Sequence, residues 1–177
     1  MGTGTVHMST LYVIRHAEPL IKGVLLGQSD PPLSDVGRRQ AATLRAEIPA
    51  GPVYTSPLQR ALQTARFLSD SPIILPKLAE ISYGEWNGLT WTEIERLWPD
   101  VAQRKLGDWD SVTPPGGESW RQFQRRVAES VQGILGGSMP AVMVAHEAVN
   151  AVVRQELTLL GVHSYKQQYC EIKRYDL

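Results

Sequence analysis

Four short apolar runs, spaced along the chain between helix signals, constrain the fold more than any other feature. Residues 10–14 read TLYVI, residues 53–55 read VYT, residues 73–75 read IIL and residues 141–145 read AVMVA. Short runs of this composition between turn residues are typical of strands. The last run is apolar throughout, which favours a strand that is buried on both faces of a sheet.

Helix signals separate these runs. Ser56, Pro57 and Gln59 are residue types preferred at the N-cap, N1 and N3 positions of a helix, so they predict a helix start. Helices are predicted over residues 34–47, 56–68, 90–98, 119–135 and 147–160, and an edge strand over residues 169–175. Strands that alternate with helices predict the α/β class, here a three-layer α/β/α sandwich with a mostly parallel central sheet.

The length of 177 residues is that of one domain. We expect residues 9–177 to form this domain, and we interpret residues 1–8 as an expression leader outside it. All five tryptophans lie between residues 86 and 120. We expect residues 84–118, which lack strand patterns, to form a small helical or loop cap over one end of the sheet. Either most of the tryptophans pack the cap's own core, which we favour, or they stack on a flat ligand.

The composition excludes several kinds of partner. Eighteen basic and eighteen acidic residues give a formal net charge of zero, so no global field attracts nucleic acid or an anionic membrane. No apolar run approaches the roughly 20 residues that a membrane-spanning helix needs. Cys170 is the only cysteine, which fits a reducing compartment. We expect a cytoplasmic monomer or homodimer that binds a small molecule.

Basic residues follow three of the predicted strands. Arg15 and His16 end the first run, His146 ends the last, and Arg60 lies in the first turns of the helix after the second run. Ligands of open α/β sheets bind beyond the carboxyl ends of the strands. A cation near a helix N-terminus is disfavoured unless an anion is nearby, so Arg60 indicates bound phosphate. Each residue alone has an ordinary structural explanation, but the four together predict an anion site.

The sequence around these residues carries an ordered series of motifs. In chain order they are RHAE at 15–18, GQSD at 27–30, PLS at 32–34 with Gly37, YTSPLQRA at 54–61, QTA at 63–65, LAE at 78–80, YGEWNG at 83–88 and PGGES at 115–119. The series resembles the histidine phosphatase superfamily, in the branch of phosphoglycerate mutases and cobalamin-pathway phosphatases. The resemblance covers residues 10 to about 160 and is closest to the α-ribazole phosphatase-like group.

This resemblance implies a role for each residue at the strand ends. His16 would be the nucleophile, since an imidazole is partly neutral at pH 7 and can form a phosphohistidine. Arg15, Arg60 and His146 would hold the equatorial phosphoryl oxygens. Glu80 would protonate the leaving alcohol and then activate water. Because the basic side chains supply the positive charge, no metal and no cofactor are implied.

Other site residues follow from the same resemblance. Gln28 and Ser29 are implied to bind substrate. Glu85 competes with Glu80 for the role of proton donor, although we favour Glu80 and interpret Glu85 as an exposed loop carboxylate.

The chain departs from the family pattern at three positions. Ala17 and Glu147 stand where the family usually has glycine, and Asn150 stands where relatives often carry arginine. Alanine is small and changes little. Glu147 either repels a phosphate or complements the dipole of the helix that it begins.

The most consistent function is hydrolysis of small phosphate esters without a metal, on a substrate of the α-ribazole phosphate type. The short chain between the third motif and His146 favours a hydrolase over a phosphoglycerate mutase-like phosphotransferase. A protein phosphatase and a catalytically weak phosphate-binding module stay open as alternatives, the latter because of Glu147.

Overall fold

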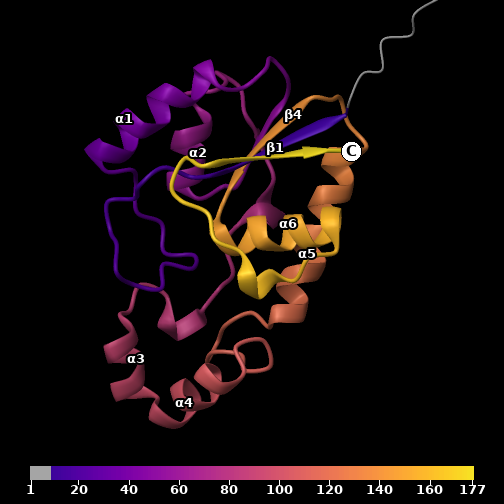
Figure 1. The fold of residues 1–177 in the computed structure, drawn as a ribbon. Helices are drawn as coiled ribbons and strands as arrows, with labels where there is room; N and C mark the ends of the chain where they lie inside the picture. The colour runs from indigo at the N-terminus through magenta and orange to yellow at the C-terminus, as the bar shows by residue number, and fades with distance from the viewer. Residues whose placement is uncertain (1–8) are drawn as a thin grey trace, which may run out of the picture.

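The computed structural model describes residues 9–177, so the expected leader at residues 1–8 lies outside the described residues. Five strands form one sheet in the order β3-β2-β4-β1-β5 (Figure 1). The strands are β1 (Thr10–Arg15), β2 (Val53–Thr55), β3 (Ile73–Ile74), β4 (Ala141–Ala145) and β5 (Ile172–Asp176). The first four are mutually parallel, and β5 pairs antiparallel with β1 at the edge. The predicted mostly parallel sheet is confirmed.

Helices cover both faces of this sheet. They are α1 (Asp35–Thr43), α2 (Gln59–Ala65), α3 (Trp91–Leu97), α4 (Pro99–Gly107), α5 (Trp120–Leu135) and α6 (Glu147–Thr158), with short 3-10 turns η1 (Leu44–Ala46), η2 (Pro76–Leu78), η3 (Gly84–Trp86) and η4 (Val162–Ser164). Side chains alternate along β4: Met143 packs with α5 and α6, whereas Val142 and Val144 pack with α2. The central strand is therefore buried on both faces, and the three-layer α/β/α prediction is confirmed.

The parallel register places the ends of two central strands at one level. Arg15 at the end of β1 is paired with Ala145 at the end of β4. The next residue of each strand is a histidine, and the His16 N–H donates to the Ala145 carbonyl at 2.9 Å. His16 and His146, which are 130 positions apart in the sequence, therefore lie side by side at the carboxyl ends of two neighbouring strands.

Residues 84–118 form two short helices and loops beside one end of the sheet, at the bottom of Figure 1. Trp86 is fully buried here with Ile94 and Ala102. Its ring meets Trp91 edge-on at 5.9 Å and Trp98 at 6.3 Å between centroids. These three tryptophans pack a small core, as favoured above, while Trp109 and Trp120 line a pocket described below.

Three local predictions were wrong. The edge strand expected over residues 169–175 covers Ile172–Asp176, because residues 168–171 form a turn. The helix expected to begin at Ser56 begins at Gln59, with Leu58 as its N-cap. The Gln59 amide, which Ser56 was expected to cap, donates to the Asp30 carboxylate instead, while the Ser56 hydroxyl accepts from the Leu58 amide and lies against His146. Pro99 does end α3, but it also occupies the first position of α4, a helix that was not predicted. Proline suits this position because the N–H groups of the first helical turn have no acceptor within the helix, so the absence of an N–H costs no hydrogen bond. Within residues 9–177, no helix has the length and apolar character needed to cross a membrane.

Candidate active site

His16 and His146 lie together at the carboxyl end of the sheet. Both are buried, with 4% and 0% of their surface exposed, and their ring centroids are 5.1 Å apart. Buried histidines beside two arginines favour the neutral imidazole, since a further positive charge there would be poorly solvated. The sheet has thus brought two neutral rings to one place.

The hydrogen bonds of His16 fix which ring nitrogen is free. Its Nδ1 lies 2.7 Å from the carbonyl oxygen of Ala17, which can only accept, so we assign the proton to Nδ1. Burial, then the charges of Arg60 and Arg15, hold the pKa of His16 well below its usual value. Nε2 therefore carries a lone pair across the neutral pH range, which is what nucleophilic attack requires.

His146, which follows β4, is held by Ser56, which follows the neighbouring strand β2. Its Nε2 lies 2.7 Å from the Ser56 hydroxyl, and its buried Nδ1 has no hydrogen-bond partner within residues 9–177. Burial and the charge of Arg60 also hold the pKa of His146 well below its usual value. A buried nitrogen without a partner is costly in a folded protein, and a bound polar group would satisfy it.

Arg60, in the first turn of α2, is almost fully buried at 1% exposure. It donates from Nη1 to the Ser29 carbonyl and from Nη2 to the Gly27 carbonyl, each at 2.8 Å. Burial lowers its pKa, an effect that the nearby Glu80 opposes, and a guanidinium stays charged in proteins. Its Nε donor has no partner among the described residues. Arg60 therefore fixes the loop at residues 27–29 and keeps one donor free.

Arg15 has several partners. Its Nη1 donates to the Gln167 carbonyl at 2.6 Å and lies 3.1 Å from the Glu147 carboxylate. The ring of Tyr169 covers its guanidinium, with 4.4 Å from Cζ to the ring centroid. Glu147 is the first residue of α6, and its carboxylate pairs with one of the two arginines of the site. This ion pair was not among the effects expected for Glu147, which were repulsion of phosphate and interaction with the helix dipole.

Glu80 lies across the pocket from these cations. Its Oε1 accepts from the Ile81 amide at 2.9 Å. Burial raises the pKa of the Glu80 carboxyl, although hydrogen bonds and Arg60 oppose the shift. A carboxyl with a raised pKa can keep its proton near neutral pH and donate it. The competing Glu85 is exposed and lines neither pocket described below.

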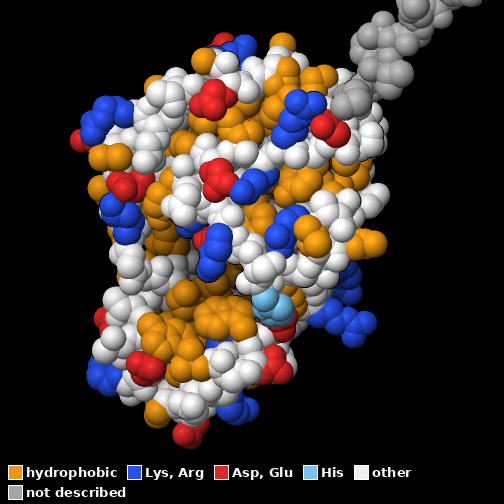
Figure 2. All heavy atoms as spheres, viewed as in Figure 1, with side chains coloured by type: hydrophobic (Ala, Val, Ile, Leu, Met, Phe, Trp, Pro, Cys, Tyr) orange, Lys and Arg blue, Asp and Glu red, His pale blue; other side chains and the backbone are white. Residues whose placement is uncertain are grey.

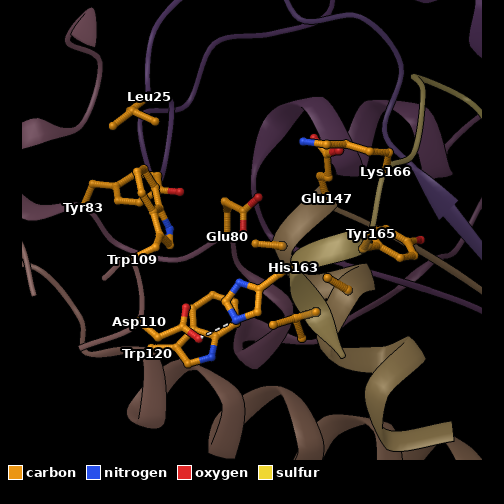
Figure 3. A pocket seen from close by; sticks show the side chains of 13 residues that line it. Leu25, Glu80, Tyr83, Trp109, Asp110, Trp120, Glu147, His163, Tyr165 and Lys166 are labelled. Atoms are coloured by element: carbon orange, nitrogen blue, oxygen red, sulfur yellow. Dashed lines mark ion pairs between the residues drawn. The ribbon is translucent and has the colours of Figure 1, made fainter. Parts of the chain in front are cut away.

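Two connected pockets lie here. The inner one, called the histidine pocket, has a volume of about 190 Å³ and is lined by Arg15, His16, Arg60, Glu80, Glu147 and Tyr169, together with Tyr83 and residues 21–27. The outer pocket, of about 490 Å³, shares Leu25, Glu80, Tyr83 and Glu147 with it and continues to Trp109, Trp120 and Lys166 (Figure 3). Figure 2 shows apolar side chains gathered on the cap side of the hollow between cap and sheet. Glu80 lies where the two pockets join.

Some of the expected site residues line the histidine pocket, and others do not. Arg15, His16, Arg60 and Glu80 line the histidine pocket, and the ring of His146 lies against His16. The side chain of Gln28 instead donates to the Glu80 carbonyl at 3.1 Å and lines a separate hollow. Ser29 contributes its carbonyl to Arg60. Neither of these two side chains lines the histidine pocket.

Sequence reasoning missed four residues around the site. Ser56 holds His146, Tyr83 lines both pockets, Tyr169 covers Arg15, and Gln167 binds Arg15 through its carbonyl. Ser56 and Tyr83 lie inside quoted motifs, so their position was a usable signal. Gln167 and Tyr169 lie in a C-terminal loop that no motif marked. No group of three or more potential metal ligands occurs in the described part of the chain.

Comparison with known proteins agrees with this geometry. A model of the histidine phosphatase superfamily (branch 1) matches residues 11–176. A 2,3-bisphosphoglycerate-dependent phosphoglycerate mutase of Bartonella quintana is 31% identical, over 84% of this chain and 87% of the relative. An adenosylcobalamin/alpha-ribazole phosphatase of Salmonella typhimurium is 29% identical, over 87% and 82%.

Two further matches bear on length and fold. A bifunctional protein of Mycobacterium tuberculosis is 35% identical over 71% of this chain, which corresponds to only 36% of that relative's length. The crystal structure of the alpha-ribazole phosphatase from Shigella flexneri superposes with a TM-score of 0.85 at 24% identity, over 95% of this chain and 90% of the other. The chain belongs to branch 1 of the histidine phosphatase superfamily.

Proposed function

We propose that this protein is a metal-independent phosphomonoesterase that hydrolyses small phosphate esters through a phosphohistidine on His16. The observation that carries the proposal is the state of His16: buried, neutral, with Nδ1 bound to a carbonyl and Nε2 left as a nucleophile. Arg15 and Arg60 line the same pocket and would balance the charge of a phosphoryl group. Relatives with phosphatase and mutase names support this chemistry.

The geometry supports a two-step reaction. In the first step, Nε2 of His16 forms a bond to phosphorus as the ester P–O bond breaks, and the Glu80 carboxyl gives its proton to the leaving oxygen. In the second step, the Glu80 carboxylate takes a proton from water. The resulting hydroxide oxygen bonds to phosphorus, and the P–Nε2 bond breaks. Inorganic phosphate leaves, and both residues return to their starting states.

The outer pocket is the place we assign to the alcohol part of the substrate. It continues from Glu80, the residue that would protonate the leaving oxygen, and it carries the rings of Tyr83, Trp109 and Trp120. Rings of this kind favour a flat, aromatic alcohol. An α-ribazole phosphate-like substrate fits this description, and the Salmonella relative carries the corresponding name.

The test is hydrolysis of p-nitrophenyl phosphate, with and without EDTA, by the wild type and by His16→Ala. We expect an active wild type that EDTA does not inhibit and a variant without measurable turnover. Binding of vanadate and a thermal melt check that His16→Ala is folded. An inactive wild type that binds vanadate would favour the phosphate-binding module instead.

A second assay separates the hydrolase from the phosphotransferase. The 31% identical mutase keeps the phosphotransferase as a candidate. We expect release of phosphate from α-ribazole 5′-phosphate and no interconversion of phosphoglycerates. Interconversion without release of phosphate would favour the mutase-like reaction, and preference for a phosphopeptide would favour a protein phosphatase.

A further inference from the structure

The C-terminal loop at residues 167–171 is fastened to the residue that precedes His16. The Cys170 amide donates to the Arg15 carbonyl at 3.0 Å, and the Arg15 amide donates to the Glu171 carbonyl at 3.4 Å. The Gln167 carbonyl accepts from the Arg15 guanidinium at 2.6 Å. Both the backbone and the side chain of Arg15 are therefore held by this one loop.

Gln167 anchors the loop in the protein interior. Its side chain is 1% exposed and makes four hydrogen bonds. The amide group donates to the carbonyls of Val13 and Glu171, and its oxygen accepts from Asn150 and from the Tyr165 hydroxyl. These bonds use the hydrogen-bonding capacity of a side-chain amide in full. The loop cannot shift without leaving buried polar groups unpaired.

A tight turn within this loop has an unusual backbone. The Glu171 amide donates to the Gln168 carbonyl at 3.2 Å, which closes the turn around Tyr169 and Cys170. Cys170 has φ of 59°, a left-handed conformation that is uncommon for a residue other than glycine. Strained conformations persist where the surroundings fix them, and they cluster at functional sites. Here the residue before the strained one is Tyr169.

The Tyr169 ring lies against the His16 imidazole and the Arg15 guanidinium. Its centroid is 5.6 Å from that of His16, with 39° between the planes, and 4.4 Å from Cζ of Arg15. It also lines the histidine pocket. A guanidinium stacked on an aromatic face keeps the donors at its edge available for other partners. The Nε donor of Arg15 has no partner in the part of the chain that the structure describes.

We propose that Tyr169 is a positioning residue for phosphoryl transfer: its ring holds the Arg15 guanidinium and the His16 imidazole in the orientation that both need toward the phosphoryl group. The proposal rests on the proposed function. It concerns a C-terminal segment that lies after the last of the motifs recognised in the sequence. The aromatic ring performs this role, and the hydroxyl is dispensable.

The test compares Tyr169→Phe, which keeps the ring, with Tyr169→Leu, which removes it. We expect kcat of Tyr169→Phe on p-nitrophenyl phosphate to stay within about twofold of the wild type, and kcat of Tyr169→Leu to fall about 10- to 100-fold, the usual effect of a misplaced reacting group. Tyr12→Leu is the control, since Tyr12 is a half-buried tyrosine of β1 that lines neither pocket. It should keep the wild-type kcat.

The pKa of His16, followed by NMR, gives a second readout. Loss of the ring exposes the imidazole, so this pKa should rise in Tyr169→Leu and not in Tyr169→Phe or Tyr12→Leu. The other charged or titratable groups around His16 are unchanged by the substitutions: Arg15, Lys22, Arg60, Glu80, His146 and Glu147.

The two proposals fail in different ways. An active wild type whose Tyr169→Leu variant keeps both kcat and the His16 pKa would overturn the role of Tyr169 alone. Loss of activity in Tyr169→Phe equal to that in Tyr169→Leu would also overturn it, because the ring would not suffice. An inactive wild type would overturn the proposed function and this inference together.

Discussion

Replacement of Glu147 by glutamine is expected to strengthen binding of phosphate esters, because the Glu147 carboxylate now occupies Arg15. Its Oε2 lies 3.1 Å from Arg15 Nη1, and the two side chains are 34% and 20% exposed. A phosphoryl group that binds Arg15 must compete with this carboxylate. Glutamine has nearly the same shape and keeps a side-chain oxygen that can accept from the backbone N–H of Gln167, as Oε1 of Glu147 does at 3.4 Å. The substitution therefore removes a charge and little else.

The size of the effect follows from the geometry of the pair. At 3.1 Å, two unit charges attract by about 1.3 kcal/mol in water and by about 5 kcal/mol at an effective dielectric constant of about 20. The exposure of both side chains places this pair near the aqueous limit, where such pairs contribute about 1 kcal/mol or less. Release of Arg15 then lowers KM about fivefold. The freed Arg15 would bind the phosphoryl group equally in the bound substrate and in the transition state, so kcat should stay within about twofold of the wild type.

Steady-state kinetics on p-nitrophenyl phosphate measure both constants, and competition by inorganic phosphate gives an independent affinity. Glu156→Gln is the matched control, because Glu156 is exposed on the same helix and lines neither pocket. A KM that is unchanged or raised in Glu147→Gln would show that Glu147 does not compete for Arg15. An equal fall in KM in Glu156→Gln would assign the effect to net charge.

Three further predictions concern Glu80, His16 and Trp86. Burial raises the pKa of Glu80, so its ionisation destabilises the folded state as pH rises; melting curves from pH 4 to pH 8 should show Glu80→Gln increasingly more stable than the wild type, while kcat falls about 10²- to 10⁴-fold. The pKa of His16 is well below its usual value, so kcat/KM should stay constant as the pH falls through about 6.5, the ordinary pKa of histidine. A value of kcat/KM that decreases as the pH falls through this range would contradict the prediction. The fully buried Trp86 packs the cap, so urea denaturation should show that Trp86→Ala costs about 3–5 kcal/mol.

Elements with local signals could be predicted from the sequence. The capping boxes at Thr90 and Ser119 both form, each with its two reciprocal hydrogen bonds, because their partners lie three residues apart. The apolar run at 141–145 becomes the central strand because only a position covered on both faces buries all its side chains. The order of the strands is set by long-range packing and could not be read from such signals.

Predictions failed where a distant partner competed with a local one. Ser56 has the sequence context of an N-cap, but the Gln59 amide that it was expected to cap donates to Asp30, 29 residues earlier in the chain. The Ser56 hydroxyl also lies against the imidazole of His146, 90 residues further along. The same reason explains why Tyr169 and Gln167 were missed. Their contacts with Arg15 join segments about 150 residues apart, and no periodicity or capping motif encodes them. Arg15, His16 and His146 were predictable because each follows a recognisable strand.

The electrostatics of the histidine pocket explain how a chain with zero net charge can bind an anion. The pKa values of both histidines are held well below the usual value, which favours their neutral forms, and the raised pKa of Glu80 favours its protonated form. Lys22 pairs with Glu18 at 2.8 Å.

Among the arginines of this pocket, Arg60 therefore has no carboxylate within ion-pair distance in residues 9–177, while Arg15 is paired with Glu147. Two unpaired guanidinium groups at one site would repel each other and be poorly solvated. The Glu147 carboxylate reduces this cost in the free protein. Its negative charge would also compete with a bound phosphoryl group for Arg15. We therefore expect Glu147, at the start of α6, to stabilise the site at the expense of substrate affinity.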